Sequence, residues 1–500
     1  MIFSSWQFAA FYAVVFAAYW TVRGRYARHL LLLVASCVFY MAWNAWLVLI
    51  VLGVAVWDYA LALGIDATRR PGIRRGLLAL SVIGNLGLLA VFKYADFLIL
   101  SLRDLLAALG LSTSLHSLHI ILPIGISFHV FQTLSYTVDV YRGDIRPTRD
   151  FIEFALFVTF FPQLVAGPIV RAAQFLPQLE TVKRLEWPRI ERCVGLFVLG
   201  LTKKLLIADQ IAPLVDRVFA DPTQFGTLDL WLAMFGYGAQ IYGDFSGYSD
   251  MAVAVAGMLG FDLPVNFRSP YLAASITDFW RRWHISLSTW LRDNLYIPLG
   301  GSRRGRRLTC RNIMITMLLG GLWHGASWTF VIWGAIHGFV LSFDKLTSSA
   351  GAESHVDPER RTPGRAGRTL IGWALTLLVV HVAWVFFRCQ PIVLPGGDPE
   401  PLVQPLARAL HFVTHLFVFR STADAVWLPG RIACIILLAL AGGLQLWEEW
   451  QHRSRHGRSS LAGWWPSIPV PIAAAALALW VAVLVVWSPG NTNPFIYFQF

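Results

Sequence analysis

The chain has 500 residues, of which 56% are hydrophobic and only 14% are charged, and its formal net charge is +12. A soluble domain carries charge on roughly a quarter of its residues, so this composition excludes an ordinary soluble protein and predicts an integral membrane protein. The positive charge is spread over short segments between apolar runs. This pattern favours contact with anionic lipid headgroups and argues against a nucleic-acid partner.

Apolar runs near the length that spans a hydrocarbon core recur along almost the whole chain. Several are short or interrupted by glycine, as in helices that break within a membrane protein. We therefore predict an all-α polytopic membrane protein with roughly 11 to 13 spanning or re-entrant helices. The predicted segments are 5–20, 30–43, 47–65, 77–102, 120–140, 151–170, 194–208, 228–242, 251–261, 313–343, 369–387, 432–446 and 470–487.

Arginines cluster in three of the breaks between these segments, at 23–28, 69–75 and 303–307. Under the positive-inside rule all three breaks are cytoplasmic, which places the N-terminus on the periplasmic side. The first apolar run lacks a basic leader and a cleavage site, so we expect it to remain as a helix.

The whole chain, 1–500, is predicted to form one membrane domain. Its long hydrophilic stretch, near 347–368, is rich in Pro, Gly and mixed charges and is expected to be a mobile loop. The five cysteines show neither a CxxC spacing nor a dense framework, which argues against disulfides or a thiolate metal site. We find no internal repeat.

The run YGDFSGYSD, starting at Tyr242, contains Asp244 and Asp250. Its Gly and Ser content predicts a helix break at this point. Acidic side chains at membrane depth need hydrogen-bond partners, so the two aspartates either form a polar constriction near a substrate path or cap helix starts. The residues alone leave both interpretations open.

The run ITDFWRRWHISLSTWL predicts an amphipathic interfacial helix near 276–292, because its large apolar residues recur at three- and four-residue steps. Asp278 and Arg282 are spaced to form an ion pair. Arg281 and His284 fall on a neighbouring polar strip. His284 is therefore either an interfacial side chain bonded to backbone or headgroups or part of a polar entrance.

A second histidine, His324, follows Trp323 inside the glycine-rich run MLLGGLWHGASWTFVIWGAIHG. Small residues let helices or a ligand approach closely. A neutral imidazole in an apolar site can accept a proton from a hydroxyl group, which makes His324 a candidate general base. The alternative is structural: His324 and His337 would be interhelical hydrogen-bond partners. No HExxH-like spacing suggests a metal.

Long blocks of this sequence resemble the membrane-bound O-acyltransferase superfamily, in the bacterial branch that includes proteins of alginate O-acetylation. The two blocks that contain the candidate histidines are YLAASITDFWRRWHISLSTWLRDNLYIPLGGSRRG (271–305) and LLGGLWHGASWTFVIWGAIHG. Further blocks are ILPIGISFHVFQTLSYTVDVYRG, FFPQLVAGPIVR, QIYGDFSGYSDMA, NFRSPY and the terminal FIYFQF. They cover nearly the full chain, so the resemblance is specific.

The resemblance implies tilted helices around a central tunnel in which His324 and His284 are the catalytic residues. The candidates that would line the tunnel or the donor entrance are Asp244, Asn266, Asp278, Arg281 and Trp323. The acyl donor would be cytoplasmic acetyl-CoA or an acyl-carrier thioester, with no tightly bound cofactor and no metal.

The resemblance also implies a bacterial inner-membrane protein that works with a periplasmic SGNH-type acetyltransferase-like partner. The acceptor would be alginate or a related exopolysaccharide, while relatives act on peptidoglycan, cellulose or teichoic acid. The alternative from another class is a transporter that moves a lipid-linked or acyl substrate without chemistry, using broken helices and polar midplane residues.

Overall fold

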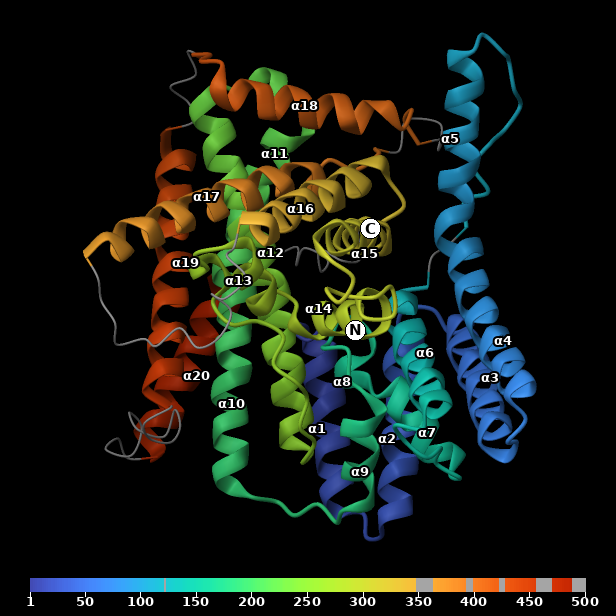
Figure 1. The fold of residues 1–500 in the computed structure, drawn as a ribbon. Helices are drawn as coiled ribbons and strands as arrows, with labels where there is room; N and C mark the ends of the chain where they lie inside the picture. The colour runs from blue at the N-terminus through green and yellow to red at the C-terminus, as the bar shows by residue number, and fades with distance from the viewer. Residues whose placement is uncertain (121–122, 348–362, 393–398, 422–427, 456–469, 488–500) are drawn as a thin grey trace.

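The computed structural model describes residues 1–120, 123–347, 363–392, 399–421, 428–455 and 470–487. These residues form α-helices joined by short 3-10 and π-helical turns, and they contain no β-strand (Figure 1). The prediction of an all-α protein is confirmed. Most of the predicted loop at 347–368 and all of the terminal FIYFQF lie outside the described residues.

The first half of the chain contains α1 (Trp6–Thr21), α2 (Arg25–Met41), α3 (Leu47–Ala67), α4 (Pro71–Leu89), η1 (Ala90–Tyr94), α5 (Ala95–Ala108), α6 (Ile126–Arg142), α7 (Phe151–Thr159), α8 (Phe161–Leu164), α9 (Ala172–Glu180), α10 (Trp187–Thr202), η2 (Lys203–Ala208), α11 (Asp209–Ala220), η3 (Pro222–Gln224) and α12 (Thr227–Met258). The second half contains η4 (Pro270–Leu272), α13 (Ile276–Arg282), α14 (Ile285–Leu291), η5 (Arg292–Tyr296), α15 (Arg306–His324), α16 (Trp328–Thr347), α17 (Pro363–Arg388), α18 (Val403–Phe417), α19 (Leu428–Arg455) and α20 (Val470–Trp487).

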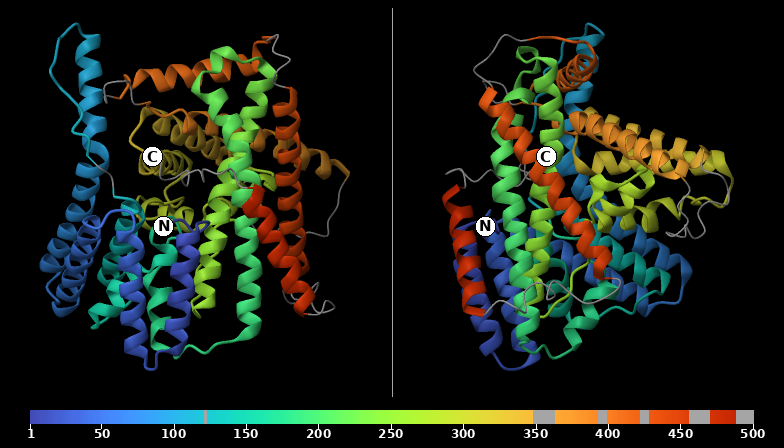
Figure 2. Two further views of the ribbon diagram at one scale, coloured as in Figure 1. Left: turned by 180° about the vertical axis from the view of Figure 1, so that it is seen from behind. Right: turned by 90° about the vertical axis from the view of Figure 1, so that its left-hand side faces the viewer.

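Two directions of helix packing organise the molecule. In Figures 1 and 2, α1, α2, α10, α12 and α19 run roughly upright, whereas α15, α16, α17 and α18 lie across them. The central element is α12, which contacts α10, α11, α17, α18 and α19. The site described below lies where the crossing helices meet α12.

Four helical stretches in the described residues are long and apolar enough to cross a membrane, which agrees with the predicted polytopic membrane protein. They are Leu47–Ala67, Pro71–Ala108, Thr369–Arg388 and Pro429–His452. Other long helices, α12 among them, carry buried polar side chains that lower their hydropathy. The number of spanning elements stays a prediction.

The predicted helix break after Tyr242 is wrong, because α12 runs without interruption from Thr227 to Met258. Its glycines serve close packing instead. A Cβ atom at Gly247 would collide with the carbonyl oxygen of Gly200 on α10, and a Cβ at Gly200 would collide with the carbonyl of Gly247. The two helices therefore touch backbone to backbone at this point.

Other boundaries also differ from the prediction. The segment 151–170 ends as a helix at Thr159 and continues as the short α8 and an irregular strip, and 313–343 is divided into α15 and α16. Three further helices, α9, α11 and α18, lie outside the predicted segments. Both α11 and α18 are amphipathic, with buried apolar residues on one side, so they lack the long apolar run on which the prediction relied.

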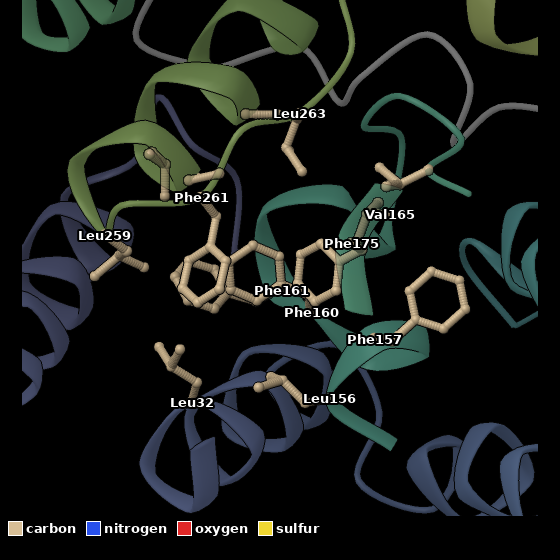
Figure 3. Close-up of a cluster of buried hydrophobic side chains, with 14 of the residues drawn as sticks. Leu32, Leu156, Phe157, Phe160, Phe161, Val165, Phe175, Leu259, Phe261 and Leu263 are labelled. Carbon is tan, nitrogen blue, oxygen red and sulfur yellow. The ribbon is translucent and has the colours of Figure 1, made fainter. Parts of the chain in front are cut away.

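A cluster of phenylalanines fixes the irregular strip between α8 and α9 (Figure 3). The ring of Phe175 lies 5.1 Å from Phe160 and 5.5 Å from Phe261, which follows the end of α12. Phe157 and Phe161 complete the buried cluster. This packing matters for the site, because the backbone N–H of Ile169 in the strip donates to the Oγ of Ser286 at 3.0 Å.

The crossing pair α15 and α16 packs through glycine. A Cβ atom at Gly321 would collide with the carbonyl of Phe330, and a Cβ at Gly334 would collide with the carbonyl of Met317. The backbones of the two helices therefore approach closely in the glycine-rich segment that contains His324.

We expect Gly334→Val to destabilise the protein by about 1–3 kcal/mol or more, because the added methyl groups force the two backbones apart. Thermal unfolding in detergent measures the change. Gly443→Val is the matched control, since a Cβ at Gly443 on α19 meets nothing within 4 Å. Equal melting shifts for the two variants would contradict the assigned packing.

Candidate active site

The predicted amphipathic helix at 276–292 is in fact two short helices, α13 and α14, which meet at Trp283 and His284. His284 adopts a left-handed backbone conformation with φ 43° and ψ 54°. This conformation is uncommon for a residue with a side chain and persists only where surrounding contacts enforce it. Trp283 is 1% exposed and His284 is fully buried, so both rings lie inside the protein. The predicted position of this segment in the membrane interface stays a prediction.

Asn266 is the residue that fixes His284. Its Oδ1 atom accepts hydrogen bonds from the backbone N–H of Ser286 at 3.2 Å and from the Ser286 hydroxyl at 2.9 Å. The same oxygen lies 3.2 Å from Nδ1 of His284. The backbone carbonyl of Asn266 also accepts from the N–H of Ile285 at 2.9 Å.

These contacts determine which nitrogen of His284 carries the proton. A backbone N–H only donates, so the Asn266 atom facing Ser286 is the oxygen and not the amide nitrogen. Nδ1 must then donate to that oxygen, and in a neutral imidazole Nε2 keeps its lone pair. No described residue forms a hydrogen bond with Nε2. The tautomer therefore presents a proton acceptor to the interior.

The second predicted histidine, His324, is the last residue of α15 and is 4% exposed. Its ring packs edge-on against three aromatic side chains. The ring centroids lie 5.0 Å from Trp323, 5.0 Å from Trp333 on α16 and 5.1 Å from Phe387 on α17. The glycine contacts between α15 and α16 thus bring His324 into an aromatic enclosure.

Trp323 lies between the two histidines. Its ring centroid is 6.1 Å from His284 and 5.0 Å from His324. Phe128 and Phe131 of α6 pack against the same indole at 5.1 and 5.2 Å. His284 and His324, 40 positions apart in sequence, therefore both pack against the ring of Trp323. The structure thus brings the two predicted catalytic residues together with Trp323 and Asn266.

A third histidine, His337 on α16, is fully buried beside Trp280 and Trp333. Neither of its ring nitrogens has a hydrogen-bond partner in the described residues. The predicted alternative, a hydrogen bond between His324 and His337, is therefore wrong.

Asp244 and Asp250 bind lysines that the sequence interpretation missed. Lys204 lies 2.8 Å from Asp244 and 2.9 Å from Asp209, and Lys203 lies 2.7 Å from Asp250. Because both aspartates lie well inside α12, the helix-cap interpretation is wrong. The sequence did contain an indication of these ion pairs. Lys203 and Lys204 interrupt an apolar segment, and a buried ammonium group requires acidic partners.

Lys203 has a second acidic neighbour, Glu448 of α19, and the hydroxyl of Tyr242 donates to the same carboxylate at 2.6 Å. The ion pairs join α12, η2 and α19 close to the site. Phe245, next to Asp244 in α12, packs against His284 with ring centroids 4.7 Å apart.

Asp278 and Arg281 belong to α13, which ends directly before Trp283. Asp278 forms the predicted ion pair with Arg282, at 3.0 Å, and Arg282 also binds Glu449 of α19 at 3.0 Å. Arg281 is exposed on the surface of α13. Their predicted place at a donor entrance stays a prediction.

Residues 88–387 match the membrane-bound O-acyltransferase (MBOAT) family. The chain is 39% identical to the probable alginate O-acetylase AlgI of Azotobacter vinelandii, with 100% of both chains covered. It is 44% identical to the probable alginate O-acetylase AlgI of Pseudomonas putida over 78% of each chain. It is also 36% identical to the peptidoglycan O-acetyltransferase of Helicobacter pylori, over 76% of this chain and 75% of that protein.

Replacing Lys203 by Met leaves two carboxylates, 25% and 18% exposed, without their buried cation. Because water reaches them in part, we expect a loss of about 1–3 kcal/mol in the free energy of unfolding, less than for a fully buried charge. Thermal unfolding in detergent and the yield of monodisperse protein measure it. The triple variant Lys203→Met, Asp250→Asn, Glu448→Gln removes all three charges and should recover most of the loss. A triple variant as unstable as the single one would show that the ion pairs are not the cause.

Proposed function

Because the chain belongs to the membrane-bound O-acyltransferase family, we propose that it moves an acetyl group from a cytoplasmic thioester across the membrane for O-acetylation of a polysaccharide. The donor is acetyl-CoA or an acyl-carrier thioester. Alginate is the proposed polymer, since full-length identity to a probable alginate O-acetylase supports it. Peptidoglycan is the next candidate by the same reasoning.

One structural observation supports this function most directly. Two buried imidazoles pack against the same indole, and Nε2 of His284 has no hydrogen-bond partner among the described side chains. Acyl transfer from a thioester to a hydroxyl group needs a side chain near the reacting carbon that accepts the hydroxyl proton and then returns it to the leaving group. A histidine can do both.

In the proposed reaction His324 acts as the general base. It takes the proton of the hydroxyl group that first receives the acyl group, before the periplasmic partner passes the acyl group to the polymer. The oxygen of that hydroxyl attacks the acyl carbonyl carbon, so that an O–C bond forms. The C–S bond of the donor then breaks, and the protonated imidazole returns the proton to the leaving thiolate. One thioester and one hydroxyl group give one ester and one thiol, so the reaction requires no metal or redox cofactor.

His284 has a separate role in the proposal. Asn266 holds its ring with Nε2 directed away from the hydrogen-bonded side, and Trp323 separates it from His324. This arrangement suits a residue that hydrogen-bonds the substrate on its way to His324. The interfacial arginines at 303–307 would attract the phosphates of a cytoplasmic donor.

The proposal includes a location and a partner. The chain is placed in a bacterial inner membrane with its N-terminus in the periplasm, and a periplasmic SGNH-type acetyltransferase-like protein completes the transfer to the polymer. The arginine distribution supports this orientation.

We expect His324→Ala to reduce consumption of labelled acetyl-CoA by the purified chain at least 100-fold, since general-base catalysis contributes about 10²–10⁴-fold. His284→Ala should reduce turnover about 10-fold or more with little loss of folded protein. Lys183→Met, at a partly exposed lysine after the end of α9 and in none of the contacts of the site, is the control. Undiminished turnover by folded His324→Ala would refute the catalytic assignment and favour a transporter.

The orientation is tested by a reporter fused after Arg307. Because positively charged breaks stay in the cytoplasm, a reporter active only in the cytoplasm should be active at this position. Activity of a periplasmic reporter at the same position would overturn the orientation. A fusion after Met1 should give the opposite result.

A further inference from the structure

The long helix α4–α5 changes to a π-helical turn at Ala90–Tyr94, and two side chains of this turn reach across to the end of α15. The hydroxyl of Tyr94 donates to the carbonyl oxygen of Leu322 at 2.7 Å. The Nζ atom of Lys93 donates to the carbonyl oxygens of Trp323 at 2.6 Å and of His324 at 3.0 Å. The contacts join residues about 230 positions apart, and one of the bonded residues is the proposed base.

These bonds satisfy the end of α15 completely. The last four carbonyls of a helix have no partner within the helix itself. The first of the four at this end, on Gly321, accepts from the N–H of Gly325 at 3.4 Å. The remaining three belong to Leu322, Trp323 and His324, and Tyr94 and Lys93 bind all of them. The position of His324 therefore depends on a helix from another part of the chain.

The ammonium group of Lys93 carries a charge that capping the end of α15 does not require. A neutral hydroxyl already satisfies Leu322, and water or an amide would satisfy a carbonyl equally well. Lys93 pairs with no carboxylate in the described part of the chain. A charge inside a membrane protein is costly and marks a functional position by default. π-helical turns inside α-helices also occur frequently at functional sites.

We propose that Lys93 is a positioning residue of the acyl-transfer site, which holds the backbone of Trp323 and His324 and, in its protonated form, supplies a positive charge beside them. The proposal rests on the proposed function of His324. When a hydroxyl attacks a thioester, negative charge develops on the acyl oxygen. A preorganised cation nearby stabilises that charge in the transition state more than in the ground state.

Three substitutions of Lys93 distinguish the effect of its charge from the effect of its hydrogen bonds to α15. Lys93→Met removes the charge and two hydrogen bonds and should lower kcat for donor consumption about 10- to 100-fold, with KM changed less than about twofold. Lys93→Arg keeps charge and donors and should recover at least a third of wild-type kcat. Lys93→Gln keeps a donor without the charge and should resemble Lys93→Met.

Tyr94→Phe is the matched control for the structural contribution. It removes one hydrogen bond to the same helix end without changing charge, so it should lower the melting temperature slightly and kcat no more than about threefold. All variants are compared as full-length purified protein, with thermal unfolding beside the kinetics. If Lys93→Met does not fold, the comparison of Lys93→Gln with Lys93→Arg decides the matter.

Wild-type kcat in folded Lys93→Met or Lys93→Gln would overturn the proposal. So would equal losses of kcat in Lys93→Gln and Lys93→Arg, because charge would then be irrelevant. The proposed function fails separately: folded His324→Ala with full turnover refutes the role of His324, whereas inactive His324→Ala with active Lys93→Gln refutes only the role of Lys93.

Discussion

Polar groups inside this protein depend on other protein groups for hydrogen bonds, because neither lipid nor apolar side chains supply them. The constraint organises the centre of the molecule. Asn266 holds the ring of His284, two lysines hold the carboxylates of α12, and Lys93 holds the end of α15. Each of these contacts joins segments far apart in sequence or different helices, so the same bonds that satisfy polar atoms also help to define how the upright and crossing helices meet.

The two histidines differ in how they are held. The ring of His284 is oriented by a side-chain amide, and its left-handed backbone is enforced by contacts with Asn266. The position of His324 is instead set through its backbone, at a helix end bound from a neighbouring element. A ring fixed by a hydrogen bond at Nδ1 keeps one tautomer, while the aromatic rings around His324 restrict its position by packing. The difference suits the separate roles proposed for them.

The sequence identified much of the site in advance. The two Trp-His pairs and the Asn266 block mark residues that lie together in the structure. The predicted helix break in α12 was wrong because glycine in a sequence can indicate either a turn or close helix packing. Glycines in α12 indicated a break, yet they permit contact with α10, since a missing Cβ serves close packing as well as turns. Nothing in the sequence indicated the role of Lys93, because its partners are backbone carbonyls about 230 residues away. Every residue has such a carbonyl, so no residue type marks the partner.

The sequence by itself determined the class of the protein, its helical membrane character and the residue types at its centre, because hydropathy and polar residues in apolar runs are properties of local composition. It also determined that His284 and His324 stand out. Only the tertiary structure decided that Trp323 lies between them, that Nε2 of His284 is the unprotonated nitrogen, and that Lys93 binds the end of α15. Those facts depend on distances between segments far apart in the chain, which local patterns do not encode.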